Sequence, residues 1–294
     1  MASRMDAGSS HYRAPLLYDG GMYPVPTSLS PSRVEAFLSC PMAFRFASIE
    51  KLPEPPSIHA TKGSMVHRVL ELLFMRPAAQ RTIETAQPAF DQATAEYRLD
   101  PEFTLLGLDE AQQQAFFDDA WSLVEAYFAI EDPTAIREIG LELRLEAKVG
   151  DLGLRGIIDR LELDEQGGLV VTDYKTGRAP GPMYQQKSLA GVHFYSFLCE
   201  EVLGQRPSSI RLMYLRTGET ITATPTAQSV RFLTTRTTAV WKAVERACTT
   251  GVFQPREGPL CKSCAYKPWC PAFGGDPALA ATEAPIKFLT PATA

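Results

Sequence analysis

Three cysteines lie close together near the end of this 294-residue chain, in the stretch PLCKSCAYKPWCPAF. Cys261 and Cys264 form a C-x-x-C pair, and Cys270 follows after a gap of five residues. Thiolates at this spacing can bind one metal centre with little bending of the backbone. A fourth ligand must come from elsewhere. Cys40 is the best candidate, because a proline follows it as Pro271 follows Cys270, and such a centre would join the two ends of the chain.

The spacing leaves the metal open, because a single zinc ion takes four thiolates tetrahedrally. Two further cysteines have plainer interpretations. Cys199 lies in the apolar run HFYSFLCEEVL, which is typical of a buried helix. Cys248 is predicted to pack at a helix end and is the alternative to Cys40 as fourth ligand.

A second group of residues is suited to binding a hard divalent cation. Asp173 and Lys175 belong to D-Y-K in an apolar run, and alternate side chains of a strand point the same way. Asp159 lies on the preceding predicted strand, with apolar residues on either side. A charge there is costly unless something compensates it, and two converging carboxylates are what such a cation needs.

The periodicity of the chain predicts an α/β fold with a mixed central sheet. Helices are expected at about 31–40, 62–74, 80–132, 183–203 and 230–247, and strands at 141–147, 154–163, 168–177, 211–216 and 219–225. We expect a flexible N-terminus over 1–29, one folded domain over 30–275 with a helical insertion at about 80–135, and a flexible tail over 276–294.

Composition narrows the class of protein. The chain is 45% hydrophobic and carries a net charge of −5, which argues against coating duplex DNA through a broad basic face. It does not exclude a nuclease with a narrow basic cleft. No apolar run is long enough to span a membrane, and the first residues lack the basic and apolar regions of a signal peptide. We therefore expect a cytoplasmic protein. The sequence contains no Walker A loop.

Five short motifs occur in an order that resembles a known family. They are SPSRVEAFLSCPMAF, KGSMVHRVLE, LRGIIDR, VVTDYKTG and the final C-x-x-C-x-x-x-x-x-C-P, spanning about residues 28–275. The set resembles RecB-type exonucleases of the PD-(D/E)XK nuclease superfamily. It is most similar to the branch that carries a 4Fe-4S cluster, as AddB-type nucleases and the CRISPR-associated adaptation nucleases do. The resemblance implies a restriction-endonuclease-like core with a C-terminal cysteine cluster.

The resemblance also implies a role for individual residues. A divalent cation, Mn²⁺ or Mg²⁺, would be held by His67, Asp159, Asp173 and the backbone carbonyl of Tyr174, and Lys175 would be the catalytic lysine. The cation would polarise the scissile phosphate and activate water, while the lysine would stabilise the developing charge. The cluster ligands would be Cys40, Cys261, Cys264 and Cys270.

The expected function is metal-dependent exonuclease activity on single-stranded DNA in repair or recombination, with a helicase as a plausible partner and no membrane association. Tyr195 is a candidate for stacking on a base. Basic residues near the motifs are candidates for contacting the phosphate backbone: Arg33, Arg45, Lys62, Arg68, Arg160, Arg178 and Lys187.

Two positions leave alternatives open. Gly191 stands where the family usually has a glutamine, four residues before Tyr195, which favours a non-catalytic binding module of a helicase–nuclease complex. A zinc-stabilised adaptor is a third interpretation. Glu142 matches an acidic position of the family's first strand, but its alternation with Arg144 and Glu146 equally describes a solvated face, so it is left out of the metal set.

Overall fold

A six-stranded mixed sheet forms the centre of the molecule, seen in a computed structural model that describes residues 22–289 and only the backbone of 182–190 and 192. The strands follow the spatial order β1 (Ser28–Leu29), β3 (Leu152–Leu163), β4 (Leu169–Lys175), β5 (Ser209–Tyr214) and β6 (Glu219–Ala223), with β2 (Glu138–Val149) also paired to β3. The β1–β3 and β4–β5 pairs are parallel and the others antiparallel. The predicted mixed α/β architecture is confirmed.

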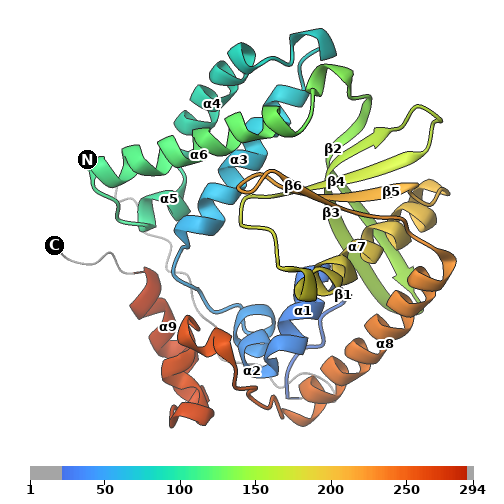
Figure 1. Ribbon diagram of the computed structural model, residues 1–294. Coiled ribbons are helices and arrows are strands. Elements are labelled where there is room, and N and C mark those ends of the chain that lie inside the picture. Colours follow the sequence, from blue (N-terminus) through green and yellow to red (C-terminus); the bar gives the residue numbers. More distant parts are fainter. Residues whose placement is uncertain (1–21, 290–294) are drawn as a thin grey trace, which may run out of the picture.

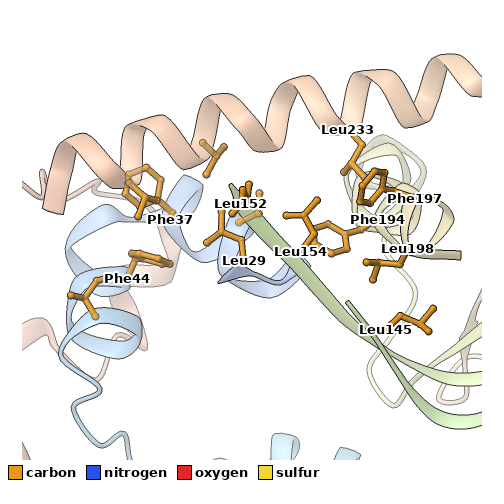
Figure 2. Close-up of a cluster of buried hydrophobic side chains, with 14 of the residues drawn as sticks. Leu29, Phe37, Phe44, Leu145, Leu152, Leu154, Phe194, Phe197, Leu198 and Leu233 are labelled. Carbon is orange, nitrogen blue, oxygen red and sulfur yellow. The ribbon is translucent and has the colours of Figure 1, made fainter. Parts of the chain in front are cut away.

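Helices cover both faces of this sheet (Figure 1). On one face, α7 (Pro182–Leu203) and α8 (Ala227–Thr250) contribute to a large buried cluster with β3 and β5. Figure 2 shows Phe194, Phe197 and Leu198 of α7 near Leu154 of β3, with Leu233 of α8 beside them. On the other face, α3 (Ile58–Phe74) packs with the inserted helices in a second cluster that includes Tyr174 of β4.

The predicted helical insertion is present as three helices. They are α4 (Ile83–Arg98), α5 (Pro101–Leu105) and α6 (Glu110–Ile130). A capping box starts α6, because the Asp109 carboxylate accepts from Gln112 N at 2.8 Å and the Gln112 amide oxygen accepts from Asp109 N at 3.0 Å. A hairpin joins β3 and β4, with Asp164 N donating to Gly168 O at 2.9 Å.

The N-terminal motif folds into closely spaced helices. Ser30 caps α1 (Pro31–Ser39), and Cys40 separates it from α2 (Pro41–Phe44) and the π-helical turn Arg45–Ile49. The prediction that residues 1–29 are flexible is wrong where the structure describes them next to α1. Ser28 and Leu29 pair with β3 and are buried, because this short strand completes the sheet beside α1. Residues 1–21 lie outside the described residues.

The C-terminal segment is more ordered than the sequence predicted. Residues 276–289 contain a 3₁₀ turn and α9 (Ala280–Leu289) instead of a flexible tail. Ala280 and Ala284 are fully buried, and the Trp269 indole N–H donates to the Glu283 carboxylate at 2.7 Å, which anchors the helix. Residues 290–294 lie outside the described residues. The short 3₁₀ turns of the chain are Ala78–Gln80, Pro133–Ala135, Pro259–Lys262, Lys267–Trp269, Pro271–Phe273 and Pro277–Leu279.

Within residues 22–289, none of the helices has the length and apolar character needed to cross a lipid bilayer.

The burial of β1 predicts that it contributes to stability. Leu29 is fully buried, so Leu29→Ala should lower the free energy of unfolding by about 2 to 5 kcal/mol. The matched control is Leu99→Ala, because Leu99 is 85% exposed and should change stability by less than about 0.5 kcal/mol. Urea unfolding followed by circular dichroism measures both, and equal midpoints for the two variants would contradict the role of β1.

Candidate active site and cysteine site

The candidate active site lies where two neighbouring strands lose their regular alternation. On β3, Ile158 and Leu161 belong to the same buried cluster although three residues apart, so the alternation shifts between them at Asp159 and Arg160. On β2, Glu142 has a left-handed φ of 43°. Leu141 and Leu143 pair with Arg160 and Ile158, so Glu142 lies opposite Asp159. Such irregularities re-aim side chains, and they are common beside active sites.

His67 reaches this point from α3 on the adjacent layer. Its Nε2 lies 3.0 Å from the carbonyl oxygen of Tyr174, and its Nδ1 lies 3.6 Å from Oδ2 of Asp159. The same Asp159 oxygen accepts a hydrogen bond from Tyr174 N at 2.7 Å. Three of the predicted metal ligands are therefore in mutual contact.

Asp173 and Lys175 form the second half of the site, on the face of β4 that packs against α7. The Lys175 ammonium forms an ion pair with Oδ2 of Asp173, and the Tyr195 hydroxyl donates to Oδ1 at 3.2 Å. Asp173 is buried, whereas the Lys175 side chain is 43% exposed. The lysine thus stays accessible to a ligand while its charge balances a buried carboxylate.

The charges of the site perturb one another strongly. Burial and the nearby Asp173 carboxylate raise the pKa of Asp159 to about 7. Burial lowers the pKa of His67 below its usual value, against the opposing effect of Asp173 and Glu142. Burial also lowers the pKa of Lys175, but the carboxylates of Asp173 and Asp159 outweigh it and the net shift is upward. The lysine is therefore a fixed cation, and Asp159 needs a further cation to be fully ionised at neutral pH.

The predicted metal ligands do not include Glu142. Its carboxylate, His67 and Asp159 each offer a ligand atom within 4.8 Å of the others. Burial and the Asp159 carboxylate raise the pKa of Glu142 to about 6. The sequence does not single out Glu142, because it lies in a run of alternating charged and apolar residues. The left-handed backbone that turns Glu142 toward His67 leaves no signal in the sequence. Asp173 is not in this close group, because its two oxygens contact Lys175 and Tyr195.

The prediction that Arg160 contacts substrate is wrong. Arg160 is fully buried, with its guanidinium paired to the carboxylates of Glu131 and Glu162 and donating to the Tyr174 hydroxyl at 2.8 Å. It lies on the opposite face of β3 from the cluster around α7 and joins the end of α6 to the sheet. Its role is to fix Tyr174, whose carbonyl faces His67.

Several other basic candidates are neutralised within the fold. The ion pairs are Arg45 with Glu50, Lys62 with Asp119, and Arg68 with Glu71 and Glu96. Arg178 is exposed, and the Lys187 side chain lies outside the described ones. Tyr195 keeps its predicted place beside the site, although its hydroxyl is already bound to Asp173.

The position of Gly191 does not conflict with a working site. Gly191 is half-buried, and a Cβ added there would meet nothing within 4 Å.

The four predicted cluster cysteines line one cavity of about 1180 Å³ between the N-terminal helices and the C-terminal segment. Burial raises the pKa of the Cys264 thiol, and the neighbouring thiols of Cys40, Cys261 and Cys270 raise it further. The Cys40 sulfur also accepts a hydrogen bond from Arg256 N at 3.5 Å. The alternative ligand, Cys248, is fully buried in the hydrophobic cluster of α8, where burial raises its pKa to about 11.

The donor set fits a divalent cation. Carboxylates, a backbone carbonyl and one imidazole are suitable ligands for Mg²⁺ or Mn²⁺, and the raised pKa values show carboxyl groups that lack compensating charge. A mixed sheet that holds such ligands beside a lysine defines the core of a metal-dependent nuclease. The chain matches the PD-(D/E)XK nuclease superfamily over residues 28–271 and belongs to that superfamily, whose chemistry is phosphodiester hydrolysis in nucleic acids.

Two individual proteins are similar to this chain. Over 266 residues it is 25% identical to the Gene 69 protein of Mycobacterium phage D29, covering 83% of this chain and 96% of that protein. It is also similar to a solved structure titled "Crystal structure of SSO0001", with 15% sequence identity and a TM-score of 0.39, covering 84% of this chain and 86% of that one.

The site predicts that a divalent cation stabilises the folded protein. Mn²⁺ at about 100 times its Kd should add about 2.7 kcal/mol to the free energy of unfolding. Asp159→Asn should abolish this gain, because it removes a charged ligand, yet leave the metal-free protein as stable as the wild type or more so, since it also removes carboxylate repulsion. Differential scanning calorimetry with Mn²⁺ and with EDTA measures both effects. An equal rise in Tm for the variant would place the cation elsewhere.

Proposed function

We propose that this protein is a metal-dependent exonuclease that degrades single-stranded DNA during repair or recombination. The observation that carries the proposal is the convergence of His67, Asp159 and Asp173 with the carbonyl of Tyr174 and the ammonium of Lys175. These residues come from three separate elements. A protein that only bound DNA would have no chemical reason to bury carboxylates so close together.

Each residue has a role that follows from its surroundings. A divalent cation held by His67, Asp159 and the Tyr174 carbonyl, with Glu142 and Asp173 beside it, supplies Lewis acidity and an activated water. Lys175 remains protonated, because Asp173 and Asp159 raise its pKa, and it stabilises negative charge on the phosphate. The Tyr195 hydroxyl holds Asp173 in one orientation. Burial of the carboxylates excludes water and strengthens these interactions.

We further propose that Cys40, Cys261, Cys264 and Cys270 bind a 4Fe-4S cluster. The support is that all four cysteines line one cavity and that the thiols of Cys40, Cys261 and Cys270 lie near enough to raise the pKa of the Cys264 thiol. The centre would be structural, since it closes a loop of more than two hundred residues between the two ends of the chain. A single zinc ion is the alternative, and metal analysis separates the two.

The proposal includes a cytoplasmic setting, in which reduced thiolates persist. A helicase partner is the remaining expectation, and it has no support beyond the resemblance of the motifs.

The nuclease proposal predicts that end-labelled single-stranded DNA is shortened in Mn²⁺ or Mg²⁺ and stays intact in EDTA. Asp173→Asn should abolish cleavage, and Lys175→Gln should lower kcat by about 10² to 10³, because it removes a cation aimed at the developing charge. Asp118→Asn is the matched control, since this exposed carboxylate on α6 contacts only Gln114.

Single-stranded circular DNA separates the two modes of cleavage. A circle should remain closed in the same assay, because an exonuclease needs an end. Cleavage of the circle would make the enzyme an endonuclease, and binding without cleavage in any metal would leave the non-catalytic binding module.

The cluster proposal predicts a brown protein when purification excludes oxygen, with equal amounts of iron and inorganic sulfide. Cys270→Ser should remove the broad visible absorption and lower Tm, because the ends of the chain lose their link. Cys248→Ser is the matched control, and it should keep the colour although it perturbs the core. A colourless protein that contains zinc would overturn the cluster and favour the zinc alternative.

A further inference from the structure

A second cleft, of about 890 Å³, opens directly beside the catalytic lysine. It lies along the edge of β3 that faces away from β2. On this edge residues 160–163 pair with β4 and residues 153–154 pair with β1, so the stretch between them is left without a partner strand in the described part of the chain. The cleft extends from Lys175 to Ser30 at the start of α1.

The outer face of the β2–β3 ribbon lines this cleft. Arg144 pairs with Ile157 across the ribbon, and Glu146 pairs with Arg155 one step further from the site. Leu145, which lies between Arg144 and Glu146, and Ile158, which follows Ile157, are buried in the cluster with α7, so these four side chains point to the opposite face. At about 3.4 Å per residue, Arg155 lies roughly 14 Å along β3 from Asp159.

The two arginines keep their charge available. Among the described residues, neither guanidinium forms an ion pair, although Glu146 lies opposite Arg155 and the Arg144 charge partly opposes the rise in the pKa of Glu142. The other acidic residue of the cleft, Glu35, is already paired with Arg236 at 2.9 Å. By contrast, Lys62, Arg68 and Arg160 near the site are all paired.

A third guanidinium lies near Arg155, although Arg33 itself does not line the cleft. Burial lowers the pKa of Arg33 on α1, and the nearby positive charge of Arg155 lowers it further. Two neighbouring cations favour the binding of an anion beside them. Between the two lining arginines, Ile157 exposes 43% of its surface, which offers an apolar contact for a sugar or an unstacked base.

The alternative is a solvated strand face, which is common for alternating charges. It does not explain why two arginines without ion pairs line one cleft that opens beside Lys175. We propose that the outer face of the β2–β3 ribbon binds the backbone of the single-stranded DNA substrate, with Arg144 and Arg155 contacting phosphates at increasing distance from the scissile bond. This inference rests on the proposed function and assigns the path of its substrate.

Binding without cleavage tests this path. The anisotropy of a fluorescein-labelled oligothymidine is measured in EDTA, so that the result does not depend on catalysis. Arg144→Gln and Arg155→Gln should each weaken binding roughly tenfold at low salt. Each should also reduce the slope of log K against log salt by about 0.7, as expected for one lost phosphate contact on a single strand.

The matched control is Arg246→Gln, because Arg246 is an exposed arginine of α8 that lines neither cleft. It should bind within about twofold of the wild type. In the cleavage assay with Mn²⁺, the two ribbon variants should raise KM and retain kcat, since they remove binding that is equal in the ground and transition states. All variants should keep the wild-type Tm, because both ribbon arginines are exposed and without ion pairs.

The outcomes separate this inference from the nuclease proposal. If the ribbon variants bind with the Kd and salt slope of the wild type while the wild type cleaves, the path is wrong and the nuclease stands. If they weaken binding but the wild type never cleaves, the path stands as that of a binding module. If all arginine variants, including Arg246→Gln, weaken binding equally, the effect is one of net charge and the path is overturned.

Discussion

The site depends on holding the buried carboxylates of Asp159 and Asp173 close together on neighbouring strands. Neither can be ionised there without compensation, and the result is an Asp159 whose pKa is raised to about 7. The surrounding groups compensate these negative charges. Lys175 balances Asp173, and the Tyr174 N–H and His67 approach Asp159. A divalent cation would supply the remaining positive charge. The arrangement that makes the two carboxylates costly to ionise would also make them good ligands for such a cation.

A second buried charge network lies behind the first and determines its geometry. Arg160 is enclosed by Glu131 and Glu162, and its guanidinium donates to the Tyr174 hydroxyl. Buried ion pairs of this kind contribute little net stability but are costly to break, because removing one partner leaves the other uncompensated. The network therefore acts as a rigid support that ties the helical insertion to β4. The backbone carbonyl of Tyr174 contacts His67, and its backbone N–H contacts Asp159.

The N-terminal helices α1 and α2 and the segment of residues 256–270 lie against one another. The Tyr266 hydroxyl donates to Leu52 O at 2.9 Å, and Arg256 contacts both Cys40 and the carbonyl of Leu38. These contacts cross more than two hundred residues of sequence, so a metal centre at the four cysteines would add a strong link where hydrogen bonds are few. The cavity lined by the four cysteines and the cleft beside Lys175 are separate in the fold, and Glu35 of α1 lines both.

Local patterns in the sequence determined much of this protein. The strand periods follow from alternating residues, and the helix caps at Ser30 and Asp109 and the hairpin at Asp164 are likewise formed by residues close together in the sequence. Composition could not reveal that Leu29 and Ala280 are buried, because their partners lie far away in the chain. Arg160 and Glu142 show most clearly what the sequence could not predict. Each lies in a strand of alternating residues. The shift of alternation at Asp159 and the left-handed backbone of Glu142 decide that Glu142, and not Arg160, enters the site. Residue types and order specified the chemistry, but which charges are buried, paired or left free was decided only when the strands and helices packed together.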